Sequence, residues 1–517
     1  MRKINNNVQL HFCMIKTITQ SLFIFIVIFS FINDSQGKII TDKETYSEDD
    51  SVLPNLIYIL ADDLGFGDLS SYGQANFETP NLDRMVAEGM KFTNHYAGST
   101  VCAPSRSVLM TGLHTGRTPI RDNNEIMPIG QYPLQYGTVT LPKILQETGY
   151  TTGAFGKWGL GYPGSEGQPS LQGFDIFFGF FCQRRSHFFY PEFLFKDVRG
   201  HRVERVYLEG NLVENASAEG FLREGSGPPI QRAQYSQDVI MEKAFDFINE
   251  NKDRPFFLYI PSQLPHASLE VPDDDLKLFL NDNGESIFEE PENQSTGAYT
   301  FNDKPLATYA AMVTRLDRYV GNILDLLEEL GLAENTLVIF SSDNGSYSEG
   351  GYHYSMHNSN APLRGGKRDL YEGGIRVPTI AWWPGHIAAG AVTDHISYFT
   401  DILPTFADIA NVSPPPTIDG ISFKPTLLGS GLQREHDYLY WEFHGQGGKQ
   451  AIRKGDWKAV RLNVRQNRYS PIELYNISVD ISEENNVAEQ YPDIVEEMNK
   501  LFYEAHIPSK LFPLFDE

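Results

Sequence analysis

Four short, continuous apolar segments are the first pattern along the chain. They occupy residues 55–61, 256–260, 337–341 and 379–383. A strand inside a parallel sheet is covered by helices on both faces, so its sequence is apolar throughout instead of alternating. The four segments therefore predict buried strands of a parallel sheet.

Amphipathic helices are predicted between these strands. The clearest has apolar side chains at helical spacing from residue 309 to residue 330 and ends at Gly331. A second begins after Thr140, a favourable N-cap residue, and stops at Gly149. Because strands alternate with helices, the chain is expected to form an α/β sandwich around a large, mostly parallel sheet.

The pattern changes after a proline-rich segment at residues 413–416. Short strand-like segments follow at residues 438–443 and 457–461, and a closing helix is predicted near residues 494–502. We therefore predict two parts beyond the N-terminal segment. They are a large α/β domain over residues 38–412 and a smaller C-terminal subdomain, with an antiparallel sheet and a helix, over residues 413–517.

The N-terminal segment has the features of a secretory signal peptide. Lys16 precedes an apolar core at residues 22–32, which is too short to span a bilayer comfortably, and a polar run follows. We expect residues 1–37 to be a signal peptide and the protein to be exported, to the periplasm, the cell surface or the medium. Met14 is an alternative start. Because no lipobox cysteine follows the apolar core, neither a lipid anchor nor stable membrane insertion is expected.

Cysteine usage gives no disulfide framework, because the chain has 3 cysteines. Cys13 lies within the predicted signal peptide. A disulfide between Cys102 and Cys182 is the alternative to two free thiols, and we do not expect it. Asn215 and Asn293 lie in Asn-x-Ser sequons, which are weak signals for glycosylation.

Composition and charge exclude some classes of partner. The chain has 517 residues, 41% of them hydrophobic, which is enough for a large core. Its net charge of −25 and pI near 4.9 argue against binding to nucleic acid or to an anionic membrane. An anionic substrate would need a basic pocket inside this acidic shell.

Cys102 opens the run Cys-Ala-Pro-Ser-Arg, which continues through an apolar stretch to Thr111 and Gly112. The run predicts a nucleophile at the first turn of a helix. Unpaired backbone N–H groups and the helix dipole favour an anion there. The alternative is a buried, weakly reactive thiol, as most lone cysteines are.

Acidic side chains follow two of the predicted strands. Asp62 and Asp63 come directly after the first strand, and Asp343 and Asn344 follow the strand at residues 337–341. Ligands of open α/β sheets gather at the carboxyl ends of the strands. An oxygen-only set of ligands suits a hard divalent cation, and calcium fits better than magnesium, which retains water. The alternative is that both are ordinary turns.

Three basic side chains are candidates for binding an anion beside this metal. Arg106 lies four residues after Cys102, so the two share a helix face. Lys157 and Lys367 lie in the glycine-rich segments Gly156–Gly159 and 363–367, which allow close approach of a ligand. The alternative for each lysine is a solvated surface charge.

Together these motifs resemble the type I, formylglycine-dependent sulfatases of the alkaline-phosphatase-like superfamily, including bacterial carbohydrate sulfatases and arylsulfatase A-like enzymes. The resemblance covers nearly all of the chain from Asn55 onward and implies an alkaline-phosphatase-like fold. It also implies that a formylglycine-generating enzyme oxidises Cys102 to formylglycine (3-oxoalanine). The hydrated aldehyde of that residue attacks a sulfate ester in this family.

The resemblance implies a role for each candidate residue. One calcium ion would be bound by Asp62, Asp63, Asp343 and Asn344. Arg106 would steady the aldehyde hydrate, and Lys157 and Lys367 would bind the sulfate. His266, in a Pro-His-Ala segment, would protonate the leaving group, as an imidazole with an unperturbed pKa can near neutrality.

The chain departs from the family pattern at Gly159, where many members have a histidine. His187 is our candidate for its replacement, and Gln183 or Arg184 for a contact to sulfate or sugar. The alternative for Arg184 and its neighbour Arg185 is a surface ion-pair face. His444 lies in a segment, residues 441–450, that resembles carbohydrate sulfatases, and it is predicted to reach the sugar.

The expected function is exo-acting removal of sulfate from a sulfated glycan, with a galactose-type unit favoured. Two alternatives remain open. Phosphonate monoester hydrolases and phosphodiesterases share the fold and can share the cysteine motif. A catalytically silent relative that binds a sulfated glycan is the second alternative, and the missing histidine is its only support.

Overall fold

The computed structural model describes residues 53–126, 129–214, 224–292 and 295–515. The predicted signal peptide, Cys13, Asn215 and Asn293 lie outside the described residues. The described residues, which begin at Leu53, form one compact unit.

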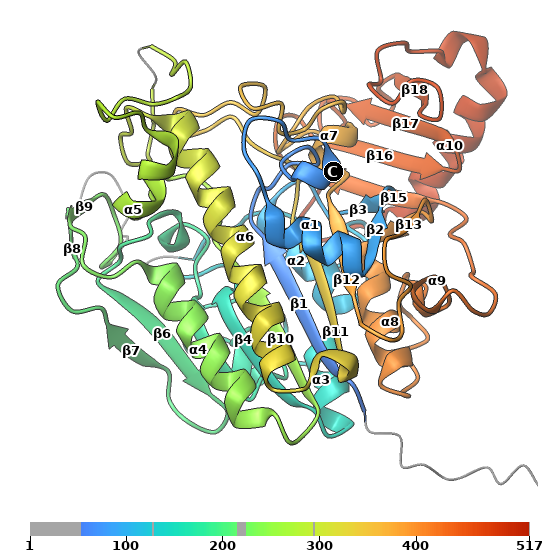
Figure 1. Cartoon of the computed structure of the whole chain (residues 1–517). Helices are drawn as coiled ribbons and strands as arrows, with labels where there is room; N and C mark the ends of the chain where they lie inside the picture. Colours follow the sequence, from blue (N-terminus) through green and yellow to red (C-terminus); the bar gives the residue numbers. More distant parts are fainter. Residues whose placement is uncertain (1–52, 127–128, 215–223, 293–294, 516–517) are drawn as a thin grey trace, which may run out of the picture. The chain divides into compact units, whose positions relative to one another are not determined.

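A ten-stranded sheet occupies the centre of this unit (Figure 1). Five neighbouring strands, β11, β1, β10, β4 and β5, run parallel, and the strands toward both edges are mixed. The sheet is therefore mixed and mostly parallel at its centre, as predicted. In spatial order the strands are β13 (Ala391–Thr393), β2 (Met90–Phe92), β12 (Thr379–Trp382), β11 (Thr336–Ser342), β1 (Asn55–Ala61), β10 (Phe256–Pro261), β4 (Thr151–Lys157), β5 (Ile176–Phe180), β6 (Phe193–Val198) and β7 (Glu204–Tyr207).

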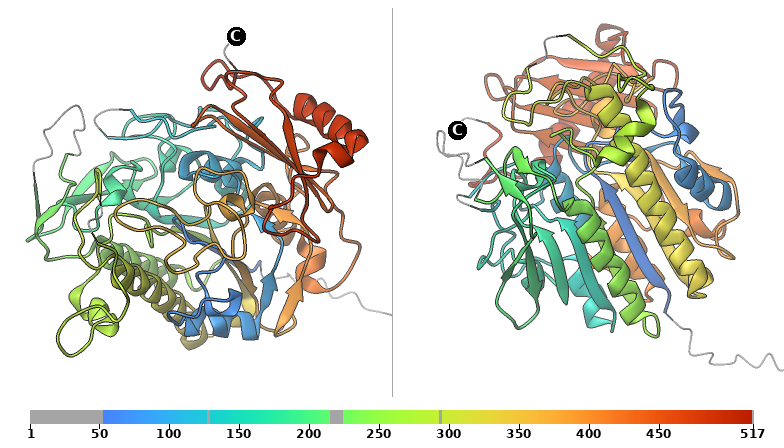
Figure 2. Two further views of the ribbon diagram at one scale, coloured as in Figure 1. Left: turned by 90° about the horizontal axis from the view of Figure 1, so that it is seen from above. Right: turned by 60° about the vertical axis from the view of Figure 1, so that its left-hand side comes forward.

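Helices cover both faces of this sheet, as Figures 1 and 2 show. One face packs against α1 (Pro80–Glu88), α4 (Ser236–Asn251) and α6 (Pro305–Glu329), and the other against α2 (Cys102–Thr111), α3 (Leu141–Glu147) and α8 (Ile402–Ile409). Successive residues of β1 alternate between the two cores: Ile57 and Ile59 belong to one, and Tyr58 and Leu60 to the other. This double burial explains why the strand is apolar throughout.

The C-terminal part forms a four-stranded antiparallel sheet, which confirms the predicted smaller sheet and helix. Its strands are β15 (Leu439–Phe443), β16 (Lys449–Lys454), β17 (Trp457–Leu462) and β18 (Ile472–Asn476). Helix α10 (Pro492–Ala505) packs on one face through a small core that includes Met498 and Phe502. The other face joins the main core through Trp441, whose Nε1 donates to the carbonyl of Ala97 at 2.9 Å. The exact boundary at residue 412 stays a prediction.

The remaining elements are short. They are β3 (His95–Tyr96), β14 (Ser397–Tyr398), β8 (Leu212–Val213), β9 (Pro229–Gln231), α5 (Asp273–Leu276), α7 (Glu372–Ile375) and α9 (Lys424–Leu428). Thr140 is the N-cap residue of α3, as predicted, but its hydroxyl donates to the carbonyl of Gln172 at 2.7 Å instead of capping the helix. Among the described residues, no helix has the length and apolarity to cross a membrane.

A buried ion cluster fixes the small sheet to the central one. Lys458 of β17 lies 2.8 Å from a carboxylate oxygen of Glu372 in α7 and 3.2 Å from one of Glu483, and all three side chains are 0% exposed. Burial raises the pKa of Glu372, but Lys458, Arg376 and Arg453 together hold it at about 2. Burial raises the pKa of Glu483 to about 7, so Glu372 and Lys458 are the charged pair of this cluster.

We predict that Lys458→Met destabilises the protein strongly, because it leaves two buried carboxylates without their shared cation. Loss of one member of a buried ion pair costs about 3–5 kcal/mol. The midpoint of urea unfolding measures this effect. The control is Lys454→Met, since Lys454 pairs with Glu497 at the surface and exposed pairs contribute about 1 kcal/mol or less. Equal midpoints for the two variants would contradict the prediction.

Candidate active site

The candidate residues meet at the carboxyl ends of four neighbouring parallel strands. Asp62 and Asp63 follow β1, and Asp343 and Asn344 follow β11. Lys157 is the last residue of β4, and the loop after β10 carries His266. Backbone hydrogen bonds from Asp62 N to the carbonyl of Leu264 (2.9 Å) and from Asp343 N to that of Ala61 (3.0 Å) tie the strand ends together. The topology thus produces the predicted cluster.

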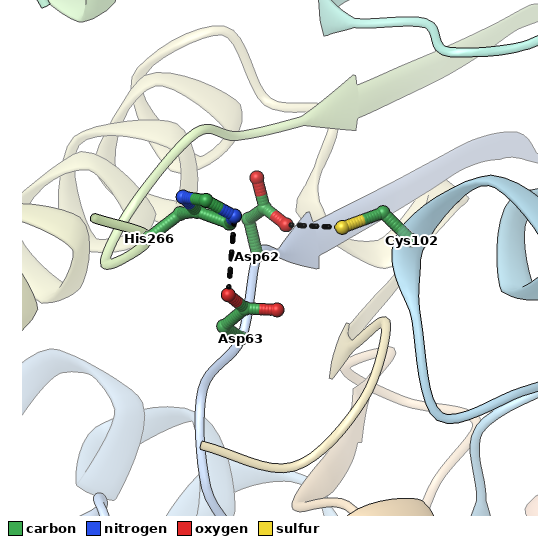
Figure 3. A group of neighbouring side chains, drawn as sticks. All are labelled: Asp62, Asp63, Cys102 and His266. Atoms are coloured by element: carbon green, nitrogen blue, oxygen red, sulfur yellow. Dashed lines mark hydrogen bonds and ion pairs between the residues drawn. The ribbon is translucent and has the colours of Figure 1, made fainter. Parts of the chain in front are cut away.

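Cys102 is the first residue of α2, as predicted, and its N-cap residue Val101 is extended. Its Sγ lies 3.4 Å from Asp62 Oδ1 and 3.4 Å from the ammonium of Lys157. Figure 3 shows the thiol pointing from α2 toward the end of β1. The nucleophile candidate therefore lies between a carboxylate and a cation, at a helix N-terminus.

Each buried carboxylate of the cluster pairs with a cation. Lys157 Nζ lies 2.5 Å from Asp62, Lys367 Nζ lies 2.7 Å from Asp63, and Arg106 Nη2 lies 2.8 Å from Asp343. Every side chain involved is at most 3% exposed. Arg106 also donates to the carbonyl of Lys157, which ties α2 to the end of β4. The predicted basic residues therefore surround the predicted metal ligands.

The acidic set fits a divalent cation. Burial raises the pKa of both Asp62 and Asp63 despite their lysine partners, so additional positive charge beside these carboxylates would favour their ionised form. Asn344 Oδ1 is buried and accepts no hydrogen bond within the described residues. Asp63 has a φ of +62°, a strained conformation for a residue other than glycine. An unpaired oxygen beside three carboxylates is a suitable ligand for a hard cation such as calcium.

His266 is neutral in this environment. Burial lowers its pKa well below the ordinary value, and Lys367 and Lys157 lower it further. Its Nδ1 donates to the carbonyl of Ala267, and its Nε2 accepts from Lys367 Nζ at 3.0 Å. Nε2 also lies 3.3 Å from Asp63, as drawn in Figure 3. The sequence suggested an imidazole with an unperturbed pKa. In the structure the pKa of His266 is lowered, and its Nε2 is hydrogen-bonded to Lys367.

A cavity of about 270 Å³ opens above Cys102. The predicted residues that line it, besides Cys102, are Gln183, Arg184, His187, His266 and Lys367. Five further residues that line it were not indicated by the sequence. These others are Asn123, Glu125, Ala298, Tyr299 and Arg368. Only Arg368 had a usable signal, since it follows Lys367 directly. The rest lie in irregular loops without a recognisable motif.

Comparison with known proteins agrees with this geometry. The sulfatase family model matches residues 54–412, and the model of the C-terminal part of N-sulphoglucosamine sulphohydrolase matches residues 366–507. N-acetylgalactosamine-6-sulfatase of Canis lupus familiaris is 32% identical, over 89% of this chain and 81% of its own length. Arylsulfatase A of Homo sapiens is 31% identical, over 87% of each chain.

The chain belongs to the sulfatase family. The crystal structure of Ps i-CgsB superposes with a TM-score of 0.69 at 28% identity, covering 88% of this chain and 93% of that one. A second structure of Ps i-CgsB contains k-i-k-neocarrahexaose. The protein is therefore a sulfatase with the alkaline-phosphatase-like α/β fold.

His187 and Arg184, two of the predicted site residues, line the cavity of the sulfatase and contact other residues that line it. The ring of His187 stacks on that of His266, with 4.4 Å between their centroids. Arg184 forms an ion pair with Glu125, and both side chains are partly exposed. Both residues line the cavity, and their roles stay predictions.

His444 is placed differently from our prediction. It is 3% exposed, its Nε2 lies 3.1 Å from Glu442, and it is not among the residues that line the sulfatase cavity. Four aromatic side chains near the candidate residues in the sequence are also buried: Phe188, Phe189, Tyr190 and Trp441 are at most 4% exposed. They serve the core, because the apolar pattern of a loop does not distinguish packing from ligand contact.

We predict that the sulfatase binds one calcium ion and that Asn344→Leu weakens this binding at least about tenfold, because it removes a neutral oxygen ligand. Calorimetric titration of metal-stripped protein with calcium measures the affinity. The control is Asn251→Leu, a buried asparagine at the end of α4, which should leave calcium affinity unchanged. Equal calcium affinity in the wild type and both variants would show that Asn344 is not a calcium ligand.

Proposed function

We propose that this sulfatase hydrolyses a sulfate ester on a carbohydrate, using formylglycine made from Cys102 and one calcium ion. The observation that carries the proposal is the position of Cys102 at the N-terminus of α2, within 3.4 Å of both Asp62 and Lys157. Formylglycine would supply a renewable hydroxyl nucleophile, and calcium would supply positive charge to the sulfate oxygens.

The state of the thiol supports modification over direct attack. Burial raises the pKa of Cys102 well above its ordinary value, and the neighbouring Asp62 raises it further. A reactive cysteine needs a lowered pKa, because the thiolate is the nucleophile. An unmodified Cys102 would therefore stay protonated and weakly nucleophilic at neutral pH.

The three cations hold and polarise the sulfate group. Arg106, Lys157 and Lys367 come from α2, β4 and the loop before α7, so three separate elements bring positive charge to the carboxylates of this site. At about 4 Å and an effective dielectric constant of about 20, each contributes roughly 4 kcal/mol of gross attraction to a unit negative charge. Fixed charges of this kind stabilise the charge that develops in the transition state.

His266 and Lys367 provide the proton for the departing alcohol. Lys367 Nζ donates to the neutral His266 Nε2 at 3.0 Å, and both side chains line the cavity. In this proposal the Lys367 ammonium gives its proton to the ester oxygen, because a donor within hydrogen-bond reach is the first requirement of general-acid catalysis.

The size of the cavity and the similar proteins favour a single sugar unit as the group recognised. Its volume of about 270 Å³ is near the lower limit, about 300 Å³, of ordinary small-molecule sites. A small cavity of this kind suits the sulfated ring at the end of a chain, and hence exo action. N-acetylgalactosamine-6-sulfatase is named for such a unit, so a galactose-type sugar is our first candidate.

We also propose that the sulfatase is exported. The apolar segment at residues 22–32 supports this, as does the acidic composition, which suits a soluble enzyme outside the cell. Separation of secreted, periplasmic and cytoplasmic fractions of the host, followed by N-terminal sequencing of the mature chain, tests it. Mature protein that keeps residues 1–37 in the cytoplasm would overturn this part.

We predict that Cys102→Ala abolishes turnover and leaves the fold intact, because the nucleophile is lost from a helix that other contacts hold in place. Peptide mass spectrometry of active wild-type protein should show loss of sulfur and gain of an aldehyde at position 102. The control is Cys182→Ala, which should keep both the modification and the activity. A fully active enzyme that contains only unmodified thiol would refute the mechanism.

We further predict that Arg184→Ala lowers kcat/KM on a 6-sulfated galactose-type sugar at least about tenfold, with a smaller loss on an aryl sulfate, because Arg184 lines the cavity and can donate to a sugar hydroxyl. The control is Arg199→Ala, an exposed arginine that pairs with Asp175 away from the cavity. Equal loss on both substrates would assign Arg184 to the sulfate. An aryl phosphodiester cleaved faster than every sulfate ester would refute the proposed activity.

A further inference from the structure

Within the part of the chain that the structure describes, the buried side chain of Gln183 makes no hydrogen bond, although it lies beside Cys102. It is 3% exposed, and within the described residues neither Oε1 nor Nε2 has a hydrogen-bond partner. It lines the same cavity as Cys102, His266 and Lys367. Burying an amide without partners costs folding free energy, so an unpaired amide in a ligand cavity indicates that a ligand supplies the partner.

The backbone of Gly159 makes room for this amide. Gly159 lies two residues after Lys157, whose ammonium is 3.4 Å from Cys102 Sγ. A Cβ atom added at Gly159 would lie 1.8 Å from Gln183 Nε2. The amide therefore occupies the space that a side chain at position 159 would take. A hydrogen bond of 3.1 Å from Gly159 N to the carbonyl of Phe181 holds the two segments side by side.

We propose that Gln183 binds an oxygen of the sulfate group at Cys102, and that Gly159 lacks a side chain in order to admit this amide. The inference rests on the proposed function and adds a neutral donor to the three cations. Sulfate oxygens only accept hydrogen bonds, so Nε2 donates to the sulfate. Oε1 then remains to accept from a hydroxyl group of the substrate.

The test compares the binding of inorganic sulfate to calcium-loaded, modified enzyme by calorimetry. Gln183→Met keeps the length of the side chain and removes its hydrogen bonds, so the dissociation constant should rise at least about tenfold. Gln183→Glu should weaken binding further, because a carboxylate repels the anion. The urea midpoint of Gln183→Met should be unchanged or higher, since a buried unpaired amide has been removed.

A second pair of variants tests the role of Gly159. Gly159→Ala forces the Gln183 amide aside and should weaken sulfate binding as much as Gln183→Met does. Any residue other than glycine is strained at its φ of +79°, so the control is Gly164→Ala, at a φ of +87° with no atom within 4 Å of the added Cβ. Gly164→Ala carries the same kind of strain and should leave sulfate binding unchanged.

The outcomes separate this inference from the proposed function. Sulfate affinity within twofold of wild type in Gln183→Met would overturn the inference, even if the enzyme hydrolyses sulfated sugars normally. A lowered urea midpoint with unchanged sulfate affinity would make Gln183 structural and also overturn it. A wild-type protein that binds sulfate through Gln183 but cleaves no sulfate ester would refute the proposed function and support the inference.

Discussion

The burial of three carboxylates at one edge of the sheet is the constraint on which the rest of the site depends. Asp62, Asp63 and Asp343 are 0% exposed, and isolated buried carboxylates would be too costly to remain ionised. Each is paired with a cation from a different element: β4, the loop before α7, and α2. The sheet, the nucleophile helix and the glycine-rich loop must therefore come together for any one of these charges to be buried.

Close backbone packing makes this assembly possible, and glycine permits it. A Cβ atom at Gly345, directly after Asp343 and Asn344, would lie 1.8 Å from the carbonyl oxygen of Gly373. At Gly156, beside Lys157, it would lie 1.9 Å from the carbonyl oxygen of Pro261. Side chains at these two positions would separate the strand ends, and with them the charges that compensate one another.

The sequence predicted the parts of this site that follow from strand ends and missed those that depend on loops. The strand Asn55–Ala61 was predicted to the residue, and the position of Asp62 and Asp63 follows from it. Tyr299 and Glu125 line the cavity because long loops fold back over it. No local sequence pattern predicts where such a loop will lie. The same limit explains His444, because its partner Glu442 is also engaged by Arg121 and His506, which are distant in the sequence. The low pKa of His266 likewise depends on burial and on lysines from two other elements.

Although the chain as a whole is acidic, the site contains enough buried cations to accept an anionic substrate. Lys157, Lys367 and Arg106 are all engaged by carboxylates, so three buried cations and three buried carboxylates are formally neutral together. A divalent cation on the carboxylates would leave a formal surplus of two positive charges, more than one sulfate ester carries. The lysines could then turn their hydrogen bonds from Asp62 and Asp63 to the sulfate. Metal binding and anion binding should therefore be coupled, because the same carboxylates compete with the sulfate for the same ammonium groups.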